Sequence, residues 1–69
     1  MDIIWEEGFS IATRSDGKAF VISANREGLR SLAAQFAALA EAAPGSHIHY
    51  DAYNSLEDGS SEWIVERAP

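Results

Sequence analysis

The chain has 69 residues and a formal net charge of −6, with eleven acidic against five basic side chains and no cysteine. This length allows one domain, residues 1–69, and the absence of cysteine excludes disulfides and Cys-ligated zinc. Nucleic-acid and membrane partners are disfavoured, because the acidic balance repels phosphates and no segment has the apolar length of a membrane span or signal peptide. We expect a cytoplasmic protein, whose acidic surface serves either solubility or the attraction of a basic partner.

The first predicted element is a β-hairpin over residues 9–24. Its turn is placed at Asp16-Gly17, a pair favoured in type I′ turns, and this register sets Ile11 opposite Ile22. Alternation then gives the hairpin one apolar side, which we expect to face the core. That side carries Phe9, Ile11, Thr13, Phe20 and Ile22.

A helix is predicted next, from Arg26 to about Ala43. Asn25 is a good N-cap, alanine and leucine dominate the segment, and Pro44-Gly45 is a stop signal. Apolar residues at three- and four-residue steps are expected to form one face that packs on the hairpin. They are Leu29, Leu32, Ala33, Phe36, Leu39, Ala40 and Ala43.

Two further strands are predicted over residues 46–52 and 62–67, joined by a polar loop with a turn at Gly59. The order is β-β-α-β-β and the expected fold class is α+β, a four-stranded, largely antiparallel sheet with one helix packed on one face. Because one helix covers only one face, the other face is either solvated or used for binding. In the last strand, Trp63 and Val65 are expected on one side, and the opposite side carries Glu62, Ile64 and Glu66.

His47, His49 and Asp51 alternate along the third predicted strand, so their side chains are expected on one side of it. Imidazoles about 7 Å apart reach one metal ion only with strain or with a further ligand. The chain has no third His and no Cys, so we predict no metal site and no cofactor. A solvated strand face and a surface for protein recognition are the two remaining interpretations.

Catalysis is not expected. The chain is rich in carboxylates, but most of them fall in loops or on polar strand sides. A catalytic carboxylate needs surroundings that shift its pKa, and a domain this thin offers few pockets. No segment resembles a nucleophile elbow or another local catalytic signature. We therefore predict a protein that is not an enzyme.

Three further features have structural as well as functional explanations. Gly28 costs a helix about 1 kcal/mol relative to Ala, and we attribute it to close packing on the hairpin. Helix propensity or a dimer contact explains a ridge of small residues, Ala34, Ala37, Ala38 and Ala42. Large aromatics exceed what one helix can cover, so some are expected at an interface; they are Trp5, Tyr50, Tyr53 and Trp63.

Four short features of the sequence together carry a resemblance to a known family. An Asn-x-x-Gly-Leu helix start at Asn25 is followed by Leu-Ala pairs, then by a Gly-Ser-His-x-His strand at 45–49 and by the segment 61–65. Over roughly residues 20–66 the chain resembles a family of small bacterial proteins, immunity protein 32 of polymorphic toxin systems.

The resemblance implies an antidote that binds and inhibits a cognate toxin domain, and the acidic balance suits a basic nuclease toxin. The partner-binding residues that we expect are His47, His49, Asp51 and Tyr53, with Glu57 and Asp58 in the acidic loop. The family pattern itself marks only Gly28, His47 and His49, and it leaves open whether they fold the protein or touch the partner.

The alternative is a homodimeric structural or regulatory module with no inhibitory activity. It predicts that the open sheet face or the alanine ridge pairs with itself about a two-fold axis. The two hypotheses are compatible in one respect, since an antidote can also be a homodimer.

Overall fold

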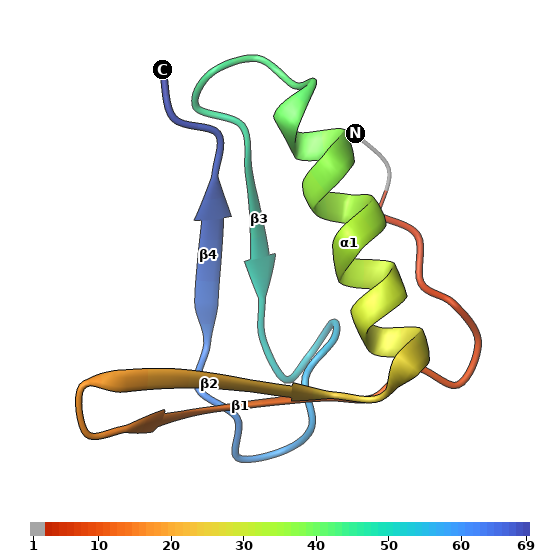
Figure 1. Ribbon diagram of the computed structural model, residues 1–69, viewed down its shortest axis with the longest axis vertical. Helices are drawn as coiled ribbons and strands as arrows, with labels where there is room; N and C mark the ends of the chain where they lie inside the picture. The colour runs from red at the N-terminus through yellow and green to blue at the C-terminus, as the bar shows by residue number, and fades with distance from the viewer. Residues whose placement is uncertain (1–2) are drawn as a thin grey trace.

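The computed structural model describes residues 3–69. Its elements are β1 (Ile11–Asp16), β2 (Ala19–Ala24), α1 (Arg26–Ala40), β3 (His47–Tyr50) and β4 (Trp63–Glu66). The α+β class and the β-β-α-β-β order are confirmed. The predicted four-stranded sheet is wrong, because β1 pairs with β2 and β3 pairs with β4 in two separate antiparallel sheets (Figure 1).

A loop, rather than a strand, occupies the outer edge of β1. The backbone N–H of Glu57 donates to the Ile11 carbonyl at 2.9 Å, and that of Ser61 donates to the Thr13 carbonyl at 3.0 Å. The Thr13 N–H in turn donates to Ser60 Oγ at 3.1 Å. These bonds use the edge groups that a third strand would need, so β1 and β4 cannot join in one sheet.

The hairpin turn lies one residue later than predicted. Asp16 pairs with Ala19, which leaves Gly17 and Lys18 as the turn and sets Ile11 opposite Ala24. Gly17 has a φ of 63°, and no described residue other than glycine has a positive φ. A turn at Asp16-Gly17 of type I′ would need a positive φ at Asp16 as well. The register moves by two residues, so the same residues still share a side. The prediction that this whole side faces the core is wrong: Ile11 and Thr13 are buried, whereas Phe20 and Ile22 are exposed.

Helix α1 begins as predicted and ends earlier. The side chain of Asn25 accepts a hydrogen bond from the Gly28 N–H at 2.8 Å, which confirms it as the N-cap. The C-cap is Glu41, whose N–H donates to the Ala38 carbonyl at 3.2 Å in a tightened last turn. Pro44 disfavours the helical conformation in the residue before it, so the helix closes ahead of that position.

The buried face of α1 differs from the predicted apolar stripe. It consists of Gly28, Ser31, Leu32, Gln35 and Leu39. Leu29 is 54% exposed and Phe36 is 37% exposed. Two polar side chains lie inside because each has a partner: Ser31 Oγ accepts from the Glu6 N–H at 2.9 Å, and Gln35 Nε2 donates to the Ile4 carbonyl at 3.0 Å.

The core lies where α1, the end of the hairpin and the inner side of β3 and β4 meet. Its buried apolar members are Ile11, Leu32, Leu39, Ile48, Tyr50 and Leu56. The Tyr50 hydroxyl donates to Gln35 Oε1 at 2.7 Å, and its ring stacks on Trp63 with centroids 4.3 Å apart. Gly28 is packed against the hairpin: a Cβ placed there would lie 2.7 Å from the Ser10 carbonyl oxygen. The structural explanation of Gly28 is therefore confirmed.

Candidate functional site

The side of the β3–β4 sheet that faces away from α1 carries both histidines. His47 and His49 are exposed, whereas Ile48 and Tyr50 between and after them are buried, as the alternation predicts. The two imidazole rings lie edge to face with centroids 4.9 Å apart. Across the ladder, His47 is opposite Glu66 and His49 is opposite Ile64. Directly opposite residues share a face, so these four side chains form one outer surface.

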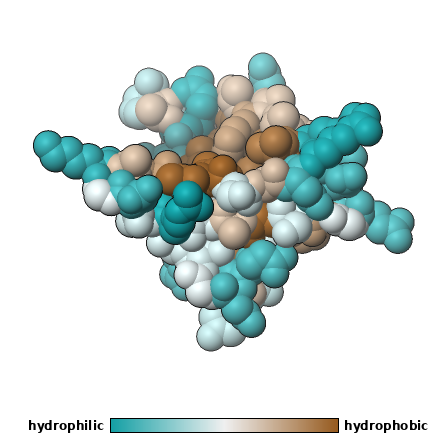
Figure 2. All heavy atoms as spheres, turned by 60° about the horizontal axis from the view of Figure 1, so that its bottom comes forward, coloured by the Kyte–Doolittle hydropathy of each residue, from teal (hydrophilic) through white to brown (hydrophobic). Residues whose placement is uncertain are grey.

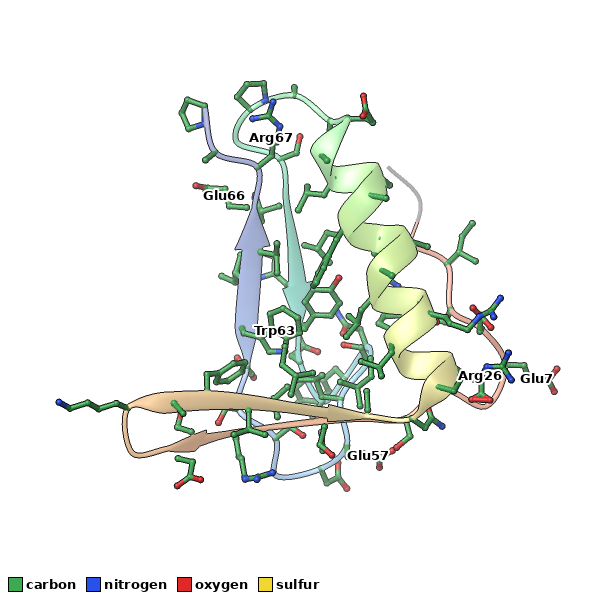
Figure 3. The ribbon with its side chains drawn as sticks, in the orientation of Figure 1. Glu7, Arg26, Glu57, Trp63, Glu66 and Arg67 are labelled. Carbon is green, nitrogen blue, oxygen red and sulfur yellow. The ribbon has the colours of Figure 1, made fainter. Side chains whose placement is uncertain are left out.

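We define the acidic sheet face as this surface extended by one residue at its lower end, His47, His49, Glu62, Ile64 and Glu66. Ile64 is 59% exposed at its centre. A hollow of about 390 Å³ opens beside it, lined by His49, Tyr50, Asp51, Glu62, Trp63 and Ile64. In Figure 3 the Glu66 side chain points away from α1, toward solvent. An apolar centre with a polar, charged rim is the usual composition of a protein-recognition surface.

Acidic residues are not balanced by basic ones in the segment from β3 to β4. Between His47 and Glu66 there are five acidic residues and no Lys or Arg. The Lys and Arg residues lie in the hairpin, in the helix and directly after β4. A basic molecule that approaches β3, β4 or the loop between them therefore meets carboxylates and no Lys or Arg of the same segment.

Asp51 and Tyr53 lie in the turn that follows β3, beside the acidic sheet face. One carboxylate oxygen of Asp51, Oδ1, accepts from the N–H groups of Tyr53 and Asn54 at 2.9 and 3.0 Å. This Asx-type arrangement gives Asp51 a role in the turn itself. Tyr53 is 97% exposed, so its ring covers none of the core and is available for contact.

Glu57 and Asp58 lie elsewhere, along the outer edge of β1. Glu57 Oε1 accepts from Ser10 Oγ at 3.1 Å, and Asp58 lines a shallow hollow with Arg14. Figure 3 shows Glu57 below the hairpin, at the opposite end of β4 from Glu66. The six predicted residues are thus divided between two places: His47, His49, Asp51 and Tyr53 around β3, and Glu57 and Asp58 under the hairpin.

Sequence reasoning did not include Glu62, Ile64 and Glu66 in the site. The alternation of the last strand already separates them from Trp63 and Val65. Their connection to the histidines depends on the pairing of β3 with β4, which joins residues more than a dozen positions apart. That pairing forms between distant segments in the folded chain, and no pattern of neighbouring residues predicts it.

The other candidate features are structural or remain untested. Within residues 3–69, no three His, Cys, Asp or Glu side chains are grouped so as to hold a metal ion. Trp5 stacks on Phe9 with centroids 4.3 Å apart and packs against the core, so it belongs with the interior. Ala34 and Ala38 of the alanine ridge line a small hollow with Ile4 and Gln35. No helix in the described residues is long and apolar enough to cross a membrane.

Comparison with known proteins gives one finding. The model of a protein family described as immunity protein 32 matches residues 19–68, from β2 to the residue after Arg67. The match includes α1, both strands of the acidic sheet face and the loop between them. No curated protein and no solved structure is similar enough to the chain to count as a match.

Proposed function

The chain belongs to the immunity protein 32 family, and we propose that it binds a cognate bacterial toxin domain in the cytoplasm and inhibits it. The observation that carries this proposal beyond the family description is the acidic sheet face, with its exposed isoleucine, its paired histidines and its surrounding carboxylates. This surface is outside the core, so its composition is not required for packing. Binding, rather than catalysis, is the chemistry that it suits.

The proposed mechanism is occlusion with electrostatic steering. Five acidic residues between His47 and Glu66 would speed the encounter with a basic toxin, and Ile64 would be buried in the complex. His49 and Asp51 line the hollow beside Ile64 and are our proposed contacts, together with the exposed Tyr53 of the following turn and with His47 at the far end of the strand. Glu57 and Asp58 would act as long-range charges, because they lie along the outer edge of β1, away from the histidines.

The test begins with a pull-down of the tagged chain from its source cells, followed by mass spectrometry. A partner with a toxin-like domain is then purified, and its binding and its effect on cell growth are measured with and without the chain. The double variant Glu62→Lys/Glu66→Lys is expected to slow association about tenfold at low salt. Its matched control, Glu7→Lys/Glu41→Lys, changes the net charge equally on residues outside the face.

Two results would contradict the proposal. If both double variants slowed association equally, net charge alone would account for steering and the acidic sheet face would have no special part. If the purified partner were neither toxic nor inhibited by the chain, the homodimeric module without inhibitory activity would be the better hypothesis.

A further inference from the structure

Strand β2 has an open edge on the side away from β1. The carbonyls of Ile11 and Thr13 accept hydrogen bonds from the 57–61 loop, so they point away from β2. Thr13 is opposite Ile22, and the two do not exchange hydrogen bonds with each other. In such a non-hydrogen-bonded antiparallel pair, the N–H and C=O of both residues point away from the partner strand. The N–H and C=O of Ile22, and those of Phe20 two residues earlier, therefore point away from β1.

Nothing in the described part of the chain satisfies these outward groups. Apart from the β1–β2 ladder, no hydrogen bond within residues 3–69 reaches the backbone of Phe20 or Ile22. In Figure 1 no element lies in front of β2. The other edge of the same sheet, on β1, is hydrogen-bonded to the 57–61 loop. The hairpin therefore has one covered edge and one open edge.

The side chains of this edge are apolar and uncharged. No residue from Ala19 to Asn25 carries a charge, although lysine or proline within an edge strand is a common protection against pairing. Phe20 is 44% exposed and Ile22 is 38% exposed. The Phe20 ring lies 6.1 Å from that of Trp63, which continues the apolar surface toward β4. Figure 2 shows hydrophobic residues gathered toward the middle of the face that it presents, with hydrophilic ones at its margins.

We propose that a second copy of this chain pairs with it through β2, edge to edge and antiparallel. The strand is self-complementary about Val21: this register sets Phe20 of each copy opposite Ile22 of the other. Those are the residues whose N–H and C=O point outward, so each pair exchanges both backbone hydrogen bonds. The two hairpins become one four-stranded sheet with a two-fold axis, and Phe20 and Ile22 form a continuous apolar row across it.

The distribution of charge favours a second copy over a basic toxin at this edge. A basic partner gains no attraction from an uncharged strand, and the nearest cations, Lys18 and Arg26, stand at its two ends. The strand that would meet its copy carries no carboxylate, so pairing through β2 brings no like charges of this strand into opposition. The pairing also leaves the acidic sheet face open, and it does not depend on the proposed toxin binding.

The test measures mass and amide protection on the purified full chain. Sedimentation equilibrium is expected to show the mass rising with concentration from 7.5 kDa to twice that value. Hydrogen exchange followed by NMR is expected to show the Phe20 and Ile22 amides becoming protected over the same concentration range. Ile22→Lys is expected to raise the dimer dissociation constant about 30-fold or more. Ser23→Lys, which points to the other side of the hairpin, is the matched control and is expected to dimerise normally.

Three results would overturn the proposal. The first is a mass of 7.5 kDa at every concentration up to that used for NMR. The second is a dimer in which the Phe20 and Ile22 amides exchange as freely as in the monomer, which would place the interface elsewhere. The third is protection of these amides only when a toxin partner is added, which would assign the edge to the toxin instead. Amide protection is measured on the wild-type chain, so it tests the proposed interface even if Ile22→Lys folds poorly.

Discussion

The two sides of the β3–β4 sheet are formed by alternate residues of the same two strands and differ in burial. The inner side packs Ile48 and Tyr50 against α1, and the Tyr50 hydroxyl is bonded to Gln35. The outer side has an isoleucine and two histidines in solvent, with no bond to the core. The difference predicts that substitutions at the inner residues change stability, whereas those at the outer residues change the proposed binding and leave stability nearly unchanged.

The largest expected effect comes from Tyr50→Ala. It removes a buried ring that stacks on Trp63 and leaves Gln35 without its partner, so we expect a loss of about 3–5 kcal/mol in the free energy of unfolding. His49→Ala, one position earlier on the outer side, is the control and is expected to change stability by less than about 0.5 kcal/mol. Urea denaturation followed by circular dichroism measures both. A loss at His49 comparable to that at Tyr50 would refute the division between the two sides.

A smaller effect is expected where the helix meets the hairpin, at Gly28. Alanine is the better helix former by about 1 kcal/mol, yet its Cβ would lie 2.7 Å from the Ser10 carbonyl oxygen, 3.0 Å from Ile11 Cγ1 and 3.2 Å from Ala24 Cβ. Because a backbone oxygen cannot move aside as a flexible side chain can, we expect Gly28→Ala to cost about 1–3 kcal/mol. Ala37→Gly, on the exposed side of the helix, measures the propensity difference alone. Stabilisation by Gly28→Ala would mean that the contact with the hairpin is loose.

Local signals in the sequence were sufficient for most of the elements. The Asn25 cap, the start of α1 and the alternation of β3 and β4 depend on neighbouring residues, and these predictions are confirmed. The alternation predicted for β2 is wrong, since Phe20 and Ile22 are exposed. The helix end and its buried face were predicted less well. Ser31 and Gln35 look like surface residues until their partners in the segment before β1 are known.

Non-local competition explains the errors in the sheet and in the site. A strand edge can bond to any segment with free N–H groups, and the 57–61 loop occupies the outer edge of β1, which is then closed to a further strand of the predicted four-stranded sheet. The same loop carries Glu57 and Asp58 away from the histidines. His47 and His49, which alternation places on one side of a strand, do lie side by side. Glu57 and Asp58, which were added to the site only because they are acidic, lie elsewhere.

The smallest effect expected from the inner side is its response to alkaline pH. Burial raises the pKa of the Tyr50 hydroxyl to about 12, from about 10 in an unfolded chain. The folded state thus favours the neutral phenol, so this stabilisation is complete below about pH 10 and is lost as the pH rises to about 12. Ionisation would also remove the hydrogen bond that Tyr50 donates to Gln35.

Tyr50→Phe isolates this contribution. At neutral pH it is expected to cost about 1 kcal/mol, since Gln35 loses its donor while the ring remains. Between about pH 10 and 12 the stability of the wild-type protein should fall toward that of the variant, because only the wild-type chain has a phenol to ionise at this position. Chemical denaturation of both proteins at a series of pH values measures the difference. A gap that stays constant across this range would mean that Tyr50 ionises equally easily in the folded and unfolded chains, and that the inner side of β3 is open to water.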